Sequence, residues 1–397
     1  MTRLPSESWT NRVGLPALLA ALDAKNGATR FVGGFVRDSL LGITSADVDC
    51  ATQLAPHDVL DRVKKAGFKA VPTGIAHGTV TAMLPGGGVE ITTLRRDVST
   101  DGRRATIAYT DDWREDAARR DFTINALSAD PESGHIYDYF GGLDDLDTGL
   151  VRFIGEPLKR IAEDHLRILR FFRFHARFGK GKPDPASLAA CTERANDLMA
   201  LSRERIADEL LKLMALPDPS ETVEIMNACH IFRPVLPEID ADAHPRVASL
   251  VRSETQAGIA PDSIRRLAAL FPPDSLLAEA MATRLKLSNT ARKRLATATG
   301  SAEAETARAL AYRLGRDSAV DRLLLNRLPE AARTIQYWDI PKLPLSGGEL
   351  VQRGLKAGPL VAATLQAIET QWISEGFPSS DRVRQIAEEK VSSALAD

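Results

Sequence analysis

Short, mainly apolar segments that suit strands occur only in the first 150 residues. Four of them lie at 29–32, 47–51, 79–84 and 89–94, and each has the length and the content of β-branched or apolar residues expected of a strand. Between the last two stands Pro85-Gly86-Gly87-Gly88, whose glycines can supply the positive φ angles of a tight turn. We therefore expect an α/β region in which these two strands pair antiparallel.

The pattern changes after about Arg152, where long stretches with a 3.6-residue hydrophobic period alternate with prolines such as Pro217 and Pro272. This pattern predicts an all-helical remainder. Between the two regions, residues 95–113 are polar and contain Asp101-Gly102. We predict a long loop there, and loops of that length are usually functional or disordered.

Composition narrows the classes of protein that remain. A chain of 397 residues with 44% hydrophobic and 26% charged residues suits several packed domains and excludes a disordered protein. No run approaches the ~18 apolar residues of a membrane span, and the three cysteines form no CxxC pair. We expect a cytoplasmic protein without a membrane, disulfide framework or zinc site. The net charge of -2 means that any nucleic-acid binding must come from local basic surfaces.

Gly33 and Gly34 follow the first predicted strand and open a helix-like stretch. Bare backbone amides at a helix start suit a phosphate group, and Arg37, one turn further on, could donate two hydrogen bonds to a triphosphate. The alternative is an ordinary tight turn before a helix, and a lone Gly-Gly pair does not decide between them.

Asp47 and Asp49 add a stronger signal. Residues i and i+2 of a strand face the same side, so their carboxylates stand side by side and repel each other unless a cation lies between them. Oxygen ligands at this spacing suit Mg²⁺, and a metal site of this kind supports phosphoryl displacement. Glu90, just after the glycine turn, is a candidate third carboxylate. A solvated pair is the alternative reading.

Five motifs, in order over about 180 residues, resemble the class II tRNA nucleotidyltransferases, which are the CCA-adding enzymes and their bacterial poly(A) polymerase relatives. The motifs are Val32 to Asp38 with Leu41-Gly42 and Asp47 to Thr52, then Arg119 to Leu127, Tyr137 to Leu143, Glu163 to Arg167, and Glu204 to Leu210. Beyond residue 215 the resemblance is thin.

The resemblance implies an α+β protein: a polymerase-β-like nucleotidyltransferase head followed by helical neck, body and tail. It places the head at 1–150, the neck at 151–215, the body at 216–335 and the tail at 336–397. It also implies an enzyme that uses CTP, ATP and Mg²⁺ to add C, C and A to a tRNA that lacks all or part of its 3′ CCA. No stable protein partner is implied.

A helix that starts near Ile161 would carry a row of arginines on one face, while apolar residues occupy most of the rest. Such a helix would be largely enclosed, so its arginines need anionic partners. The row consists of Arg167, Arg170, Arg173 and Arg177.

Asp164 and Arg167 together offer one acceptor and one donor. That pair matches the amino group and ring nitrogen of both cytosine and adenine, whereas uracil and guanine present the reverse order. A buried mismatch costs roughly 1–3 kcal/mol per unsatisfied group, so UTP and GTP should be refused. The alternative is a simple i,i+3 salt bridge.

The second motif should line the same cleft. We expect Arg120 to meet the triphosphate or the sugar, Asn125 to bind the nucleotide as well, and Asp121 to orient Arg120. Outside the motifs, residues 281–302 contain five basic and no acidic residues, which makes them a candidate tRNA-backbone contact or a solvated helix surface. The segment from Gly354 to Pro359 could also meet RNA, but a simple helix start is the better interpretation.

Two other functions remain open at this point. A poly(A) polymerase would share every catalytic residue, although the short, neutral segment 72–79 lacks the basic, aromatic-rich extension that such relatives tend to carry. A catalytically silent RNA-binding module would have lost an acidic or arginine motif, and none is lost. Because relatives that add only two cytidines lack a flexible loop here, the segment 95–113 favours addition of the terminal A.

Overall fold

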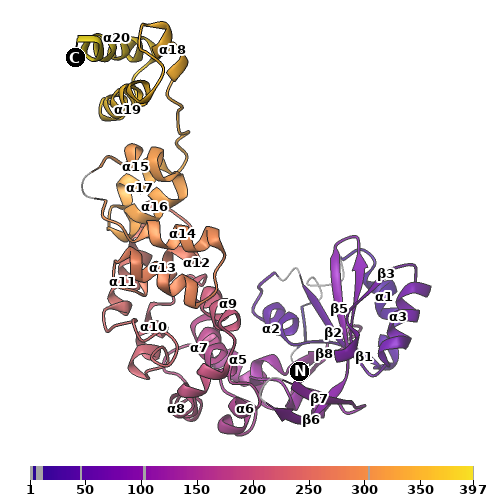
Figure 1. Cartoon of the computed structure of the whole chain (residues 1–397). Coiled ribbons are helices and arrows are strands. Elements are labelled where there is room, and N and C mark those ends of the chain that lie inside the picture. Colours follow the sequence, from indigo (N-terminus) through magenta and orange to yellow (C-terminus); the bar gives the residue numbers. More distant parts are fainter. Residues whose placement is uncertain (1–2, 6–11, 45–46, 102–103, 303–304, 397) are drawn as a thin grey trace. The chain divides into compact units, whose positions relative to one another are not determined.

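The computed structural model describes residues 3–5, 12–44, 47–101, 104–302 and 305–396. Contacts divide the chain into two compact units, Met1–Leu213 with Ala228–Val235 and Met214–Asn227 with Leu236–Asp397. The first combines a mixed sheet with helices and the second is helical, so the expected α+β class is confirmed (Figure 1). The finer division into head, neck, body and tail stays a prediction. No helix among the described residues combines the length and apolar character needed to cross a bilayer.

A seven-stranded sheet organises the first unit in the order β3-β4-β5-β2-β1-β8-β9. The glycine turn joins β4 and β5, which pair antiparallel as predicted, whereas β2 and β5 run parallel. The strands are β1 (Thr29–Val32), β2 (Val48–Thr52), β3 (Lys69–Gly74), β4 (Thr79–Leu84), β5 (Gly87–Thr93), β8 (Ser128–Ala129) and β9 (Ile136–Tyr137).

Alternation gives the central strands one buried face and one open face. Val48, Cys50 and Ile91 are almost completely buried, and α3 (Pro56–Lys65) packs on β3, β4 and β5, with α1 (Leu15–Ala21) beside it (Figure 1). The intervening residues Asp49 and Glu90 are register partners and therefore share the opposite face. Burial of one face thus forces the two carboxylates to project from the other.

The prediction of a long loop at 95–113 is wrong, because most of this segment forms two paired strands. β6 (Arg95–Asp101) pairs antiparallel with β7 (Arg104–Tyr109), and α4 (Trp113–Ala118) follows. β6 is polar apart from Val98 and so shows no apolar period, whereas β7 has only a short alternation, of Ala105, Ile107 and Tyr109, inside the segment predicted as a loop. The ladder satisfies the backbone groups of both strands. Gly102, a candidate pivot of the loop, lies outside the described residues.

The arginine helix also differs from its prediction, because the chain breaks at Asp164. α6 (Pro157–Glu163) ends there in an extended conformation, and α7 (Arg167–Phe178) begins three residues later. Apolar residues of α7 join Phe122 and Phe153 in an aromatic core, with Phe122 and Phe171 centroids 6.4 Å apart. The remaining elements of this unit are η2 (Ala24–Asn26), α2 (Gly34–Leu40), η3 (Ile75–His77), η4 (Thr123–Asn125), α5 (Gly142–Thr148), α8 (Pro185–Glu193), η5 (Ala195–Ala200) and α9 (Arg203–Met214).

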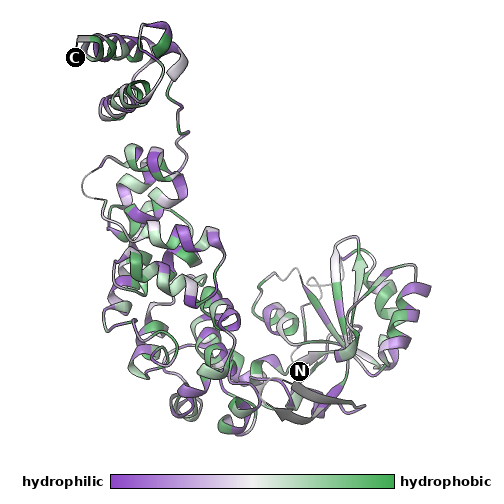
Figure 2. Ribbon diagram, in the orientation of Figure 1, coloured by the Kyte–Doolittle hydropathy of each residue, from purple (hydrophilic) through white to green (hydrophobic). Residues whose placement is uncertain are grey.

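The second unit contains helices whose hydrophobic and hydrophilic residues lie on different faces (Figure 2). Its core includes charged side chains: Glu254 accepts from Arg265 and from Arg266 at 2.7 Å, and all three are at most 3% exposed. Its helices are α10 (Ser220–Ala228), α11 (Ala243–Ala257), α12 (Ser263–Ala269), α13 (Ser275–Arg284), α14 (Asn289–Ala298), α15 (Ala307–Leu314), α16 (Arg316–Leu325), α17 (Pro329–Ile335), α18 (Gly347–Gln352), α19 (Pro359–Ser374) and α20 (Ser380–Ala396).

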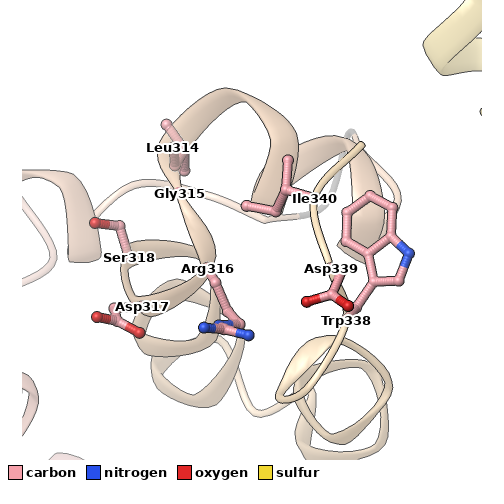
Figure 3. Close-up of a pocket in the computed structure, with 8 residues that line it drawn as sticks. All are labelled: Leu314, Gly315, Arg316, Asp317, Ser318, Trp338, Asp339 and Ile340. Carbon is pink, nitrogen blue, oxygen red and sulfur yellow. The ribbon is translucent and has the colours of Figure 1, made fainter. Parts of the chain in front are cut away.

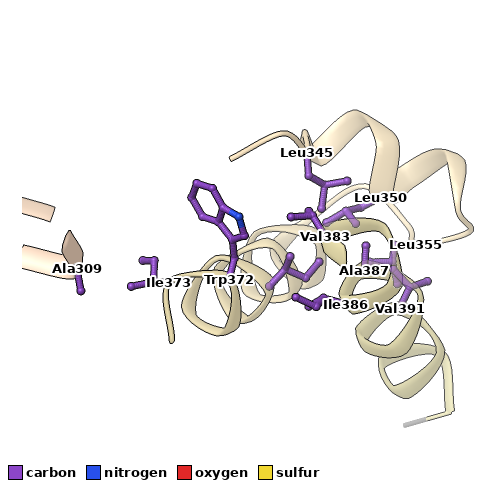
Figure 4. Close-up of a cluster of buried hydrophobic side chains, with 11 residues drawn as sticks. Ala309, Leu345, Leu350, Leu355, Trp372, Ile373, Val383, Ile386, Ala387 and Val391 are labelled. Atoms are coloured by element: carbon purple, nitrogen blue, oxygen red, sulfur yellow. The ribbon is translucent and has the colours of Figure 1, made fainter. Parts of the chain in front are cut away.

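The last three helices have an apolar cluster around Trp372 (Figure 4). Trp372 is 2% exposed and donates its indole N–H to the Pro378 carbonyl at 2.9 Å. α18 starts with a capping box between Ser346 and Glu349, and α19 starts directly after Gly358. The segment before Pro359 is thus a helix start, as preferred from the sequence.

Candidate active site

A hollow of about 460 Å³ in the first unit brings together all nine residues predicted to bind a nucleotide. Six arginines and two aspartates line it, so its charge favours an anionic ligand. We call it the arginine hollow. Its lining consists of Gly33, Gly34, Arg37, Arg119, Arg120, Asp121, Asn125, Asp164, Arg167, Arg170, Arg173 and Phe174.

The turn formed by Gly33 and Gly34, between β1 and α2, brings backbone to the wall of the hollow. Gly33 has φ 65°, a conformation that side-chain-bearing residues rarely adopt. A Cβ on Gly33 would also lie 2.8 Å from the Arg120 guanidinium. Glycine is therefore required here by its backbone angle, and a side chain would in addition displace the end of Arg120.

A chain of buried hydrogen bonds holds one side of the hollow in place. Arg37 is 5% exposed and donates to the Asn125 side-chain oxygen, while Asn125 donates to Asp121 at 2.9 Å. Asp121 in turn accepts from Arg170 at 2.5 and 2.8 Å. Burial alone would raise the pKa of Asp121, but Arg170, Asn125 and the Phe122 N–H outweigh it and the pKa is lowered.

The expected role of Asp121 needs correction. It orients Arg170 and Asn125, whereas Arg120 pairs with Asp116 at 3.2 Å. Asp116 is 3% exposed and also pairs with Arg119 at 2.8 Å. Asp116 and Arg119 were missed in the sequence, although an acidic residue three positions before an Arg-Arg pair on a helical stretch was an available signal.

Asp164 and Arg167 both line the hollow, but not as a salt bridge on one helix. Arg167 pairs with Glu163 at 2.5 Å and donates to the Arg119 carbonyl at 3.1 Å. Asp164 instead accepts from Arg205 of α9 at 2.8 and 3.1 Å. The extended backbone at Asp164 separates the two side chains, so each is held by its own partner.

The expectation that the arginines of α7 need anionic partners is confirmed. Arg173 pairs with the buried Glu209 at 2.6 Å, and Arg177 lies 3.4 Å from Asp38. Together with the pair between Arg170 and Asp121, these contacts fix the guanidinium groups before any ligand arrives. A preorganised cationic wall loses less freedom when an anion binds.

Outside the lining of the hollow, the three predicted carboxylates Asp47, Asp49 and Glu90 lie near one another, and Arg120 of the lining lies near Asp49. Burial, followed by the charge of Glu90, raises the pKa of Asp49 to about 6; Arg120 opposes this, and Asp47 adds to it. Among the described residues no three acidic, histidine or cysteine side chains form a ready-made metal cluster. The mutual repulsion of these carboxylates nevertheless fits a divalent cation, whose binding would relieve it.

Two features of the second unit suit a nucleotide less well than the arginine hollow does. A hollow of about 490 Å³ beside Trp338 contains Arg316 but also Asp317 and Asp339 (Figure 3). In the basic stretch, Arg284 pairs with Glu238 at 2.7 Å and Arg294 with Asp321 at 2.6 Å. Those two arginines are therefore already neutralised, and RNA contact by this stretch stays a prediction.

Comparison with known proteins adds two family matches. Residues 29–152 match the family described as the poly A polymerase head domain. Residues 182–242 match the probable RNA and SrmB-binding site of polymerase A. The two matches coincide with the sheet and with the helices that follow the arginine hollow.

Similar proteins extend the match over most of the chain. The mitochondrial CCA tRNA nucleotidyltransferase 1 of Homo sapiens is 34% identical over 92% of this chain and 87% of its own. A CCA-adding enzyme of Lacticaseibacillus paracasei is 30% identical, with 91% and 92% covered. The crystal structure of the Bacillus stearothermophilus CCA-adding enzyme with CTP has a TM-score of 0.72, covers 96% of this chain and 99% of its own, and at 24% identity supports the fold alone.

Proposed function

The chain belongs to the family of CCA tRNA nucleotidyltransferases, and we propose that it adds C, C and A, without a nucleic-acid template, to the 3′ end of tRNA from CTP and ATP with release of pyrophosphate. One observation carries this proposal. Arg120 lines the arginine hollow and its charge also acts on Asp49, the register partner of Glu90, so one side chain links the anion-binding wall to the candidate catalytic carboxylates.

Nucleotidyltransferases of this family depend on a divalent metal, and Mg²⁺ is the ion that we propose. Asp47, Asp49 and Glu90 would hold it, as their repulsion and open sheet face allow. When bound, such an ion neutralises charge that develops on phosphate oxygens. Activity that is lost in chelator and restored by Mg²⁺ would support this assignment, whereas full activity in chelator would contradict it.

The chain's own residues bind and orient the nucleotide. Arg37, Arg120 and Arg170 face the hollow and suit the triphosphate, because guanidinium groups donate paired hydrogen bonds to phosphate oxygens. Gly33 and Gly34 let the backbone approach the same place. Asp164 and Arg167 also line the hollow, and we assign the choice of base to them.

Removing the Asp164 carboxylate tests base choice. We expect Asp164→Ala to lower the preference for CTP over UTP and for ATP over GTP by about tenfold or more, because the acceptor for the amino group is gone. Single-nucleotide incorporation kinetics measure these ratios. Asp208→Ala, which removes an exposed aspartate of α9, is the control and should keep the parent's ratios. Unchanged selectivity in Asp164→Ala would make this residue structural.

The β6–β7 hairpin offers a test of the change from C to A. Its base is tied to the site, since the Arg95 N–H lies 3.3 Å from Asp116, which holds Arg120. Cytosine and adenine differ in size, so part of the pocket must readjust between them. We expect a shortened hairpin to keep CMP addition within about twofold and to slow AMP addition at least about tenfold. Product lengths on a gel distinguish the two steps, and AMP addition at the parental rate would make the hairpin a connector only.

Neither a poly(A) polymerase nor a catalytically silent RNA-binding module is favoured. The relatives above are named for CCA addition, and the acidic and arginine residues that a silent module would lose are present and adjoin one another. Incubation with ATP alone and a generic RNA separates a poly(A) polymerase, which would make long tails, from the proposed enzyme, which should not. A cytoplasmic location remains part of the proposal; the human relative is mitochondrial.

A further inference from the structure

Threonine side chains cover the sheet next to the catalytic carboxylates. Thr81 on β4 is the register partner of Glu90 on β5, and Thr79 is the partner of Thr92. Partners in an antiparallel pair project from the same face, so these hydroxyl groups share the open face with Glu90. Thr73 joins the row, because its hydroxyl lies 2.8 Å from that of Thr81. We call Thr73, Thr79, Thr81 and Thr92 the threonine row.

The threonine row is open to a ligand and carries no charge. Thr79, Thr81 and Thr92 are half-buried and Thr73 is exposed, whereas Val80 and Ala82, on the opposite face of β4, are completely buried. Gly88 packs closely on Thr81, since a Cβ there would come within 3.1 Å of the Thr81 methyl group, so glycine avoids a crowding side chain beside the row. A row of hydroxyl groups can both donate and accept hydrogen bonds.

The sheet order places the row and the arginine hollow on opposite sides of Asp49. β2, which carries Asp49, has β1 and the Gly33 turn on one side and β5, β4 and β3 on the other. In phosphoryl transfer the attacking and leaving oxygens lie roughly in line, on opposite sides of phosphorus. A triphosphate in the arginine hollow therefore requires the attacking hydroxyl to arrive from the side of Glu90 and Thr81.

From this arrangement we infer that the threonine row receives the 3′-terminal ribose of the tRNA, and that Thr81 hydrogen-bonds its 2′-hydroxyl. This inference rests on the proposed function. Cross-strand partners have Cβ atoms about 4.5–5.5 Å apart, so a ribose whose 3′-hydroxyl lies at the carboxylates has its neighbouring 2′-hydroxyl within reach of Thr81. Thr81 can bond Thr73 and still accept or donate a second hydrogen bond. Thr81 is thus a binding residue that distinguishes an RNA end from a DNA end.

A cycle of two changes tests the contact. Thr81→Val keeps the shape and the β-branching of the side chain, so the strand should tolerate it. The second change is a tRNA whose terminal nucleotide lacks the 2′-hydroxyl. We expect Thr81→Val to lower kcat/KM for tRNA about five- to tenfold with the normal end and to have almost no effect with the deoxy end. The KM for CTP should stay unchanged, and Thr81→Ser should restore most of the loss.

Controls separate this inference from the proposed function. The parent protein must add CMP to tRNA in the same assay; if it does not, the proposed function fails first. Thr192→Val, on the exposed surface of α8, should match the parent. Three results with an active parent would overturn the inference. Thr81→Val could lose kcat/KM equally with both tRNA ends, it could raise the KM for CTP instead, or it could match the parent. In each case Thr81 does not bind the terminal ribose.

Discussion

Asp49→Asn is expected to reduce incorporation of both CMP and AMP at least about 10³-fold, because the change removes a charged ligand from the carboxylate row that holds the proposed metal. Affinity for tRNA should stay nearly intact, since the proposed role of Asp49 is to hold metal rather than RNA. Asp47→Asn should behave in the same way, and Glu90→Gln should cause a large but smaller loss. Rapid-quench incorporation and filter binding measure the two properties.

Asp61→Asn is the matched control, because it removes an equal charge from the exposed surface of α3. It should leave incorporation unchanged. Near-normal turnover in a variant lacking both Asp47 and Asp49 carboxylates would contradict the metal assignment, and normal activity in Glu90→Gln would place the third ligand elsewhere.

Asp49→Asn should also stabilise the metal-free protein at neutral pH. The folded-state pKa of Asp49 is about 6, above the usual value of 3.8. Stability from the protonated carboxyl is therefore present below about pH 4 and is lost as pH rises through about 6. We expect the free energy of unfolding of Asp49→Asn to exceed that of the parent by about 1–2 kcal/mol at pH 7.5, after allowance for solvent, and by about half as much at pH 5. Denaturant titrations in chelator at the two pH values measure the difference.

The second large effect is expected in the helical unit. Glu254→Gln should lower the free energy of unfolding by about 3 kcal/mol, because Arg265 and Arg266 would lose the carboxylate that both share. Arg265 keeps a contact of 3.3 Å with Asp321 and a hydrogen bond of 2.6 Å to the Ala260 carbonyl, and Arg266 keeps backbone carbonyls. Unfolding followed by circular dichroism measures the loss.

Glu279→Gln, at an exposed position of α13, is the control and should change stability by less than about 0.5 kcal/mol. At 25 °C the folded fraction of Glu254→Gln should still incorporate CMP. A decrease in the free energy of unfolding of less than about 1 kcal/mol would show that neighbouring polar groups replace the Glu254 carboxylate, and it would contradict this prediction.

Hydrophobic patterning predicted the parts of the fold whose strands have one buried face. The antiparallel pair around the turn at residues 85–88 follows directly from alternation and turn chemistry. The shared face of Asp49 and Glu90 also depends on the parallel pairing of β2 with β5, which alternation alone does not predict. The β6–β7 hairpin did not follow, because β6 is polar and the apolar alternation in β7 is short. The break at Asp164 was also hidden, since the residues on both sides continue a helical pattern.

A second limit of sequence analysis was the pairing of residues that are distant in the sequence. Asp164 pairs with Arg205, 41 positions away, and Asp121 pairs with Arg170, 49 positions away. Local spacing instead suggested the neighbours Arg167 and Arg120. Motif resemblance identified nine of the twelve residues that line the arginine hollow, but only tertiary structure assigns which carboxylate holds which guanidinium.

The central claim is stepwise addition of C, C and A, and one measurement tests it most directly. A tRNA that lacks its 3′ CCA is incubated with Mg²⁺ and CTP, ATP or both, and product mass is determined at each time point. The account predicts two added cytidines with CTP alone, no long product with ATP alone, and three added residues followed by a stop with both nucleotides. Long adenosine tails with ATP alone, or no addition to tRNA under any condition, would contradict it.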